Sequence, residues 1–126
     1  MKLKREPTKL EKKAKKGFRG YPVATIAYYG PDDAKATKVS VGIVAQKDGH
    51  PVALERWRSD ADVRFDAGIN EAILAFITER GAKTVVLTDR IIGCPHEEGA
   101  DYPAGESCPQ CPYWEGRDRW TGRSLH

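Results

Sequence analysis

All three cysteines of this 126-residue chain lie in one segment near its end, from Cys94 to Cys111. His96 follows Cys94 by two positions, so an extended chain directs both side chains to one side. Cys108 and Cys111 have two residues between them, a gap that lets a tight turn present two thiolates to one ion. The spacing predicts one zinc ion bound by Cys94, His96, Cys108 and Cys111.

Three Cys and one His would fill a zinc tetrahedron, which is the arrangement of structural rather than catalytic sites. Residues 91–126 show no hydrophobic periodicity and contain four Pro and five Gly. So long a segment without secondary structure is unusual in a compact domain, and a metal ion would order it. Two alternatives stay open: a redox pair of Cys108 and Cys111, and thiols that bind no metal.

The first half of the chain is typical of three β-strands. Residues 36–46 alternate between apolar and polar positions, the strongest strand pattern in the sequence. Residues 22–29 are rich in β-branched and aromatic side chains and end at a turn signal, Gly30–Asp33. Residues 51–58 follow a hairpin turn at Lys47–Gly49. We therefore expect an antiparallel meander.

A helix and a fourth strand follow. The helix is predicted from an apolar stripe formed by Ile69, Ala72, Ile73, Phe76 and Ile77. Asp66 is the expected N-cap, and Gly81 the expected stop. Residues 83–89 centre on an uninterrupted apolar run, Val85 to Leu87, which indicates a buried parallel strand. The predicted fold is α+β: a three-stranded antiparallel meander, a crossover helix, a fourth parallel strand and an irregular, zinc-stapled C-terminal loop.

This order of elements is similar to the opening of ribonuclease-H-like folds, whose nucleases hold two metal ions with carboxylates. In that family the first carboxylate lies within the first strand, whereas residues 23–28 contain no acid. Asp89, at the end of the fourth strand, would lack its main partner. The resemblance implies the topology without the nuclease activity.

Charge divides the chain into two parts. Residues 1–20 contain nine Lys or Arg and two Glu, whereas the remainder is mildly acidic. This basic arm has too few large apolar residues to offset the entropy of ordering it, so we expect disorder or a fraying helix around residues 8–16. Residues 21–126 are predicted to be a single α+β domain that includes the zinc-binding segment 91–126.

Basic and aromatic residues indicate a nucleic-acid partner. Lysines of the arm would attract phosphates without regard to sequence. Aromatic and guanidinium groups in residues 112–123 could stack on unpaired bases, or the rings could simply cover the metal loop. The candidate nucleic-acid-binding residues are Lys12, Lys13, Lys15, Lys16, Arg19, Trp114, Arg117, Arg119, Trp120 and Arg123.

The segment around His96, Glu98 and Cys108-Pro-Gln-Cys111 resembles the H-x-E…P-C-x-x-C signature of zinc nucleobase deaminases. The resemblance implies zinc ligation by His96, Cys108 and Cys111, with Glu98 as the acid/base. Ser107 stands where the signature has Pro, and nine residues between the half-motifs are too few for the strand that separates them in that fold. The deaminase is therefore an alternative interpretation.

We expect a small non-enzymatic zinc-binding module that binds nucleic acid, with RNA or a ribonucleoprotein as the favoured partner. No catalytic residue is assigned. The alternatives are a zinc-dependent hydrolase or deaminase that uses Glu97 or Glu98, and a protein-interaction adaptor. The basic N-terminus has no apolar run behind it, and no apolar run is long enough to span a bilayer. The sequence thus favours a cytoplasmic location without membrane association.

Overall fold

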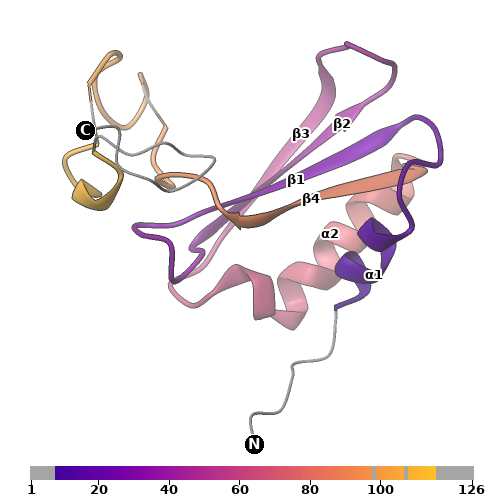
Figure 1. Cartoon of the computed structure of the whole chain (residues 1–126), viewed down its shortest axis with the longest axis horizontal. Helices are drawn as coiled ribbons and strands as arrows, with labels where there is room; N and C mark the ends of the chain where they lie inside the picture. Colours follow the sequence, from indigo (N-terminus) through magenta and orange to yellow (C-terminus); the bar gives the residue numbers. More distant parts are fainter. Residues whose placement is uncertain (1–7, 98, 107, 116–126) are drawn as a thin grey trace, which may run out of the picture.

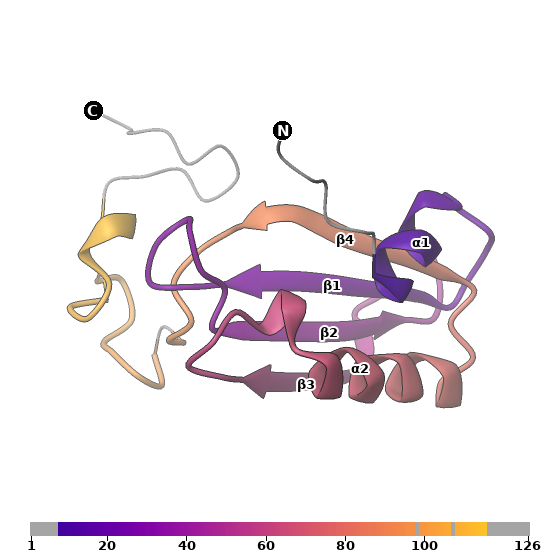
Figure 2. The same ribbon diagram turned by 90° about the horizontal axis from the view of Figure 1, so that it is seen from below.

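The computed structural model describes residues 8–97, 99–106 and 108–115. A four-stranded sheet carries two helices on one face (Figures 1 and 2). The strands lie in the order β3-β2-β1-β4, with β1 parallel to β4 and the other neighbours antiparallel. Their bounds are β1 Val23–Tyr29, β2 Lys38–Val44, β3 Pro51–Arg58 and β4 Thr84–Ile91. The predicted meander, crossover helix and parallel fourth strand are confirmed.

The core lies between the sheet and the helices. Strand alternation places Ile26 of β1 with Val39 and Val41 of β2 on the covered face, all at most 1% exposed. Helix α2 (Ala67–Glu79) covers them with Ile73 and Ile77 of the expected apolar stripe. This apolar layer is what the period-two and period-3.6 patterns predict.

The helix ends follow from local hydrogen bonds. The Asp66 carboxylate accepts from the Ile69 amide at 2.9 Å, as an N-cap does. A short 3-10 turn, η1 (Val63–Phe65), precedes it. At the C-terminal end Gly81 has a φ of 68°, which a glycine adopts at little steric cost. The expected start and stop are confirmed.

Helix α1 (Lys9–Lys15) lies beside β4 on the same face of the sheet (Figure 2). Thr8 and Glu11 form a capping box, which satisfies two amides at the start of the helix. Leu10 is 1% exposed and belongs to the core. The helix expected around residues 8–16 is therefore present, and it is packed rather than frayed. The separation of a basic arm from the domain at residue 20 stays a prediction, and residues 1–7 lie outside the described residues.

Within residues 8–97, 99–106 and 108–115, no helix covers the opposite face of the sheet (Figure 1). Lys38 pairs with Arg58 across β2 and β3, and Ser40 pairs with Arg56 two positions along. Since neighbouring positions of a strand face opposite ways, these side chains lie on the face away from Val39. β4 ends at Ile91 and leads into the cysteine-containing segment at this end of the sheet.

Candidate metal centre

The four predicted ligands come together. His96 Nδ1 lies 3.2 Å from Cys94 Sγ, 3.4 Å from Cys108 Sγ and 3.6 Å from Cys111 Sγ. One ligand atom from each of the four residues lies within 4.8 Å of the others. Cys94 and Cys111 lie far apart along the chain, so it is the fold that brings the four side chains together.

These distances fit a shared ion. Tetrahedral zinc sites with Zn–S of about 2.3 Å and Zn–N of about 2.0 Å have edges of roughly 3.5 Å between sulfur and nitrogen and roughly 3.8 Å between two sulfurs. A single imidazole Nδ1 carries at most one proton, so it cannot donate to three sulfurs at once. An ion between them would bind all four atoms. The group can therefore hold a metal ion with all four positions of a tetrahedron filled by protein.

Short local turns position the ligands. The His96 amide donates to Cys94 Sγ at 3.2 Å, so the backbone itself stabilises this sulfur. The Cys111 amide donates to the Cys108 carbonyl at 3.3 Å, which closes the tight turn that the two-residue gap predicted. η2 (Pro112–Trp114) follows directly, and its Trp114 amide donates to the Cys111 carbonyl at 3.2 Å.

Burial changes the chemistry of the thiols. Cys108 is 8% exposed and Cys111 3% exposed. In the metal-free group, burial raises the pKa of Cys94 and of Cys111, because a thiolate is costly to desolvate. A bound cation reverses this preference and deprotonates a coordinating thiol. Binding of a metal ion here would accordingly release protons.

The cysteine-containing segment is attached to the end of the sheet by hydrogen bonds. The Ile92 amide donates to the Tyr28 carbonyl at 2.9 Å, and the Gly30 amide donates to the Gly93 carbonyl at 2.8 Å. The Trp114 indole Nε1 donates to the Gly30 carbonyl at 2.7 Å. These contacts hold both halves of the metal centre against the end of β1.

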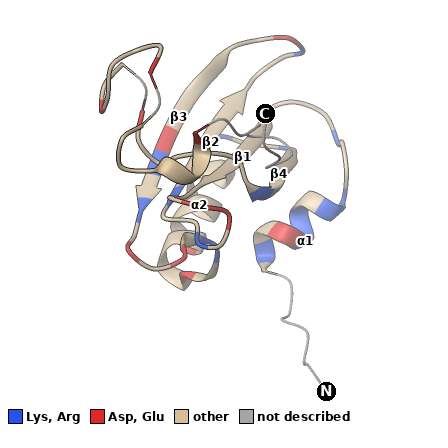
Figure 3. Cartoon of the chain, turned by 60° about the vertical axis from the view of Figure 1, so that its left-hand side comes forward, with Lys and Arg blue, Asp and Glu red and all other residues tan. Residues whose placement is uncertain are grey.

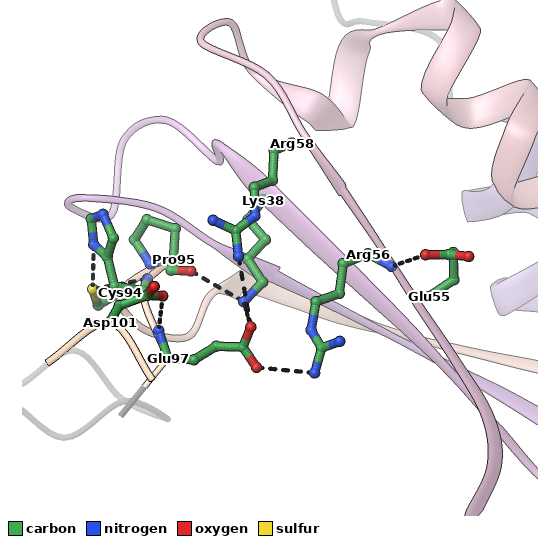
Figure 4. A network of polar contacts seen from close by, with 9 residues as sticks. Lys38, Glu55, Arg56, Arg58, Cys94, Pro95, Glu97 and Asp101 are labelled. Carbon is green, nitrogen blue, oxygen red and sulfur yellow. Dashed lines mark hydrogen bonds and ion pairs between the residues drawn. The ribbon is translucent and has the colours of Figure 1, made fainter. Parts of the chain in front are cut away.

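Three cations of the sheet surround Glu97 (Figure 4). Its carboxylate lies 3.0 Å from an Arg56 guanidinium nitrogen, 3.6 Å from Lys38 Nζ and 3.7 Å from an Arg58 nitrogen. Lys38 Nζ also donates to the Pro95 carbonyl at 3.1 Å. Burial lowers the pKa of Lys38, the Glu97 charge opposes this shift, and the two arginines add to it.

This network was not foreseen from the sequence. The available signal was the alternation of β2 and β3, which places Lys38, Arg56 and Arg58 on one face. Glu97 itself is engaged by these cations and is not one of the grouped metal ligands. Glu98, the other candidate base, lies outside the described residues.

The nucleic-acid candidates are divided between the two ends of the sheet. The exposed arm residues occupy α1 and the segment after it, beside the start of β4 (Figure 3). Trp114 lies at the opposite end, partly buried against the core. β4 has eight residues, so these ends are separated by about 26 Å at roughly 3.3 Å per residue.

Trp114 is held by contacts with the core and with its neighbour in η2. Its ring packs against the core and edge-on to Tyr113, with centroids 4.9 Å apart. The other four candidates of this segment, Arg117, Arg119, Trp120 and Arg123, lie outside the described residues.

No protein-family model matches the sequence, and comparisons with curated proteins and with solved structures give no significant match. In the described part of the chain, no helix has the length and apolar character needed to cross a membrane. Fold and site together define a mixed α+β protein with a Cys3His candidate metal centre at one end of its sheet.

Proposed function

We propose that the protein is a non-enzymatic, zinc-stabilised module that binds single-stranded nucleic acid, with RNA as the favoured ligand. The observation that carries the proposal is a cluster of four cations from separate segments, here called the basic cluster. They surround a hollow of about 120 Å³. The basic cluster consists of Lys13, Lys16, Arg19 and Lys83.

The fold fixes the positions of these cations. Lys13 and Lys16 are three apart, so they project from one side of α1 and its C-cap. The Arg19 amide donates to Thr84 Oγ1 at 2.8 Å, and the Lys83 amide donates to the Pro22 carbonyl at 2.8 Å. Lys83 is a residue of the domain that lies next to cations of the predicted arm.

None of the four forms an ion pair with a carboxylate in the part of the chain that the structure describes. Lys9, which faces Glu71 at 3.5 Å, shows that α1 can make such pairs. Cations held together without acidic partners repel one another and attract a polyanion. A phosphate backbone supplies that charge, with counterion release as the driving force.

The metal centre supports a structural role for the ion. Zinc is the ion that prefers three thiolates and one imidazole at tetrahedral positions. Four protein ligands leave no open position for substrate or activated water, which favours binding over hydrolysis or deamination. The cations around Glu97 hold its carboxylate in ion pairs, which disfavours it as a general base.

The test compares two double variants of full-length, metal-loaded protein. Lys16→Gln/Lys83→Gln removes two charges of the basic cluster. Lys35→Gln/Lys47→Gln removes two exposed lysines elsewhere and is the matched control. Fluorescence anisotropy with a single-stranded RNA should show a salt slope reduced by about 1.4 for the first pair, at roughly 0.7 per contact. The control should keep the wild-type slope.

Equal slopes for both pairs and wild type would contradict the proposal. Wild-type protein that shows no salt-sensitive binding to RNA, yet retains a protein partner, would favour the adaptor alternative.

A further inference from the structure

A second cavity lies on the open face of the sheet, between β2, β3 and the cysteine-containing segment. Its volume is about 420 Å³, within the range of roughly 300–1,000 Å³ of small-molecule sites. Two candidate metal ligands, Cys94 and His96, lie along one side of this space, whereas the basic cluster does not reach it. We call it the sheet cleft, and its other polar and aromatic lining residues are Tyr29, Lys38, Ser40, Arg56, Glu97 and Tyr102.

A buried ammonium group points to an anion in the sheet cleft. The Lys38 side chain is only 5% exposed, although lysines are rarely buried without a close partner. Lys38 has three N–H donors. One reaches the Pro95 carbonyl at 3.1 Å, whereas the Glu97 carboxylate, at 3.6 Å, lies beyond good hydrogen-bond distance.

Glu97 occupies the position of an anionic ligand. Figure 4 shows its carboxylate between the charged ends of Lys38 and Arg56, with Arg58 next to Lys38. Only the contact to Arg56, at 3.0 Å, is close. Two guanidinium groups and one ammonium offer many more donors than a carboxylate has oxygens. The site therefore has more hydrogen-bond donors than the Glu97 carboxylate can accept from, and a larger anion could use them.

We propose that the sheet cleft binds a phosphate monoester, with Glu97 as an internal competitor that must turn away. The source is either a free mononucleotide or the phosphorylated end of an RNA strand. The second source rests on the proposed nucleic-acid function, whereas the first does not.

Charge and shape favour a monoester over an internal phosphodiester. A monoester has three acceptor oxygens and a charge of about −1.5 to −2 at neutral pH, whereas a diester carries one negative charge. Arginine binds phosphate in a bidentate manner, with two parallel N–H···O bonds. The Tyr29 ring, whose centroid lies 5.4 Å from Lys38 Nζ, provides an aromatic surface next to the cations. A nucleoside attached to the phosphate would contact this surface.

Two variants should change the affinity of the sheet cleft for phosphate in opposite directions. Arg56→Gln removes the closest cation, and Glu97→Gln removes the competing charge. Arg80→Gln is the matched control, because Arg80 lies over the Phe76 ring at the end of α2. Calorimetric titration with adenosine 5′-monophosphate should show binding that Arg56→Gln weakens roughly tenfold or more and Glu97→Gln strengthens. Adenosine should not bind, and Arg80→Gln should behave as wild type.

Short RNA strands phosphorylated at the 5′ end, at the 3′ end or at neither end then identify the source. Tighter binding of one phosphorylated strand, lost in Arg56→Gln, assigns the cleft to an RNA end. Binding of the mononucleotide without any effect of end phosphorylation assigns it to a free nucleotide.

The proposal is overturned if neither the mononucleotide nor any terminal phosphate binds to protein that folds and retains its metal. In that case Lys38, Arg56 and Arg58 serve only to dock the metal loop. RNA binding that depends on Lys16 and Lys83 would survive this result, so the two proposals fail independently.

Discussion

Trp114 Nε1 donates a hydrogen bond of 2.7 Å to the carbonyl oxygen of Gly30, across 84 positions of sequence. Gly30 directly follows β1, and Trp114 is the last residue of η2, which begins directly after the candidate ligand Cys111. A Cβ atom at position 30 would collide with the Lys35 carbonyl oxygen, so only glycine fits this corner. The bond therefore joins a rigid corner of the sheet to the second half of the metal centre.

Removal of this bond should loosen the metal loop. Trp114→Phe keeps an aromatic ring but loses the N–H donor. We expect the free energy of unfolding to fall by about 1 kcal/mol and zinc transfer to a chelator to accelerate. Urea unfolding and a colorimetric chelator assay measure the two effects. Trp57→Phe is the control, because it also replaces a partly buried indole with a smaller ring but lies on β3. This variant should leave the rate of zinc release unchanged. Equal release rates in both variants would mean that the bond does not stabilise the centre.

The metal should contribute directly to folding. Cys108→Ser removes one ligand, and the free energy of unfolding should fall by several kcal/mol because metal binding stabilises only the folded loop. The wild-type protein treated with a strong chelator is the control. After this treatment wild type and Cys108→Ser should melt at nearly the same temperature in a calorimeter. A large difference that persists without metal would assign the effect to packing of the thiol instead.

The pH dependence of the metal-free protein follows from the thiol pKa values. Burial raises the folded-state pKa of Cys94 and Cys111 above the ordinary value of 9.0. Above about pH 9 the unfolded chain loses these protons first, so the stability of the metal-free protein should fall as pH rises through this range. Chemical denaturation from pH 7 to pH 10 measures it. Metal-loaded protein, whose thiolates are already formed, should lack this decline. A decline of the same size with metal bound would contradict the coupling.

Helix α1 should depend on one side chain. Leu10→Ala should cost about 2–5 kcal/mol, as other large-to-small core substitutions do. The same variant should weaken RNA binding, because Lys13 and Lys16 are held by this helix. Ala14→Gly, a change on the same helix with a smaller loss of buried volume, should cost about 1 kcal/mol. Equilibrium denaturation separates the two, and similar small effects would mean that α1 is not anchored by Leu10.

Periodic patterns made much of the fold predictable. The alternation around Val39 and Val41 and the stripe that contains Ile73 each specify a buried face without reference to the rest of the chain. Asp66 and Gly81 mark helix ends through local hydrogen bonds and backbone conformation. The candidate metal ligands were predictable as two pairs for a similar reason, because the spacings of Cys94–His96 and Cys108–Cys111 are local.

Features that depend on long-range packing were not predictable. Leu10 appears isolated among lysines, and only the position of α1 beside β4 shows that it enters the core. The ion pairs of Glu97 require both the β2–β3 register and the path of the metal loop. Lys83 likewise joins the basic cluster only because β4 lies parallel to β1. Sequence spacing contains no information about such contacts.

The composition of the metal coordination shell is the most direct test of a structural zinc site with four protein ligands. X-ray absorption at the zinc edge, on protein purified without added metal, should show one zinc per chain with three sulfur ligands at about 2.3 Å and one nitrogen at about 2.0 Å. The spectrum should not change when small anions are added, because the protein supplies all four ligands. A shell with fewer sulfurs and an exchangeable oxygen would contradict the account and would favour a catalytic metal. Protein free of zinc and equally stable would contradict it as well.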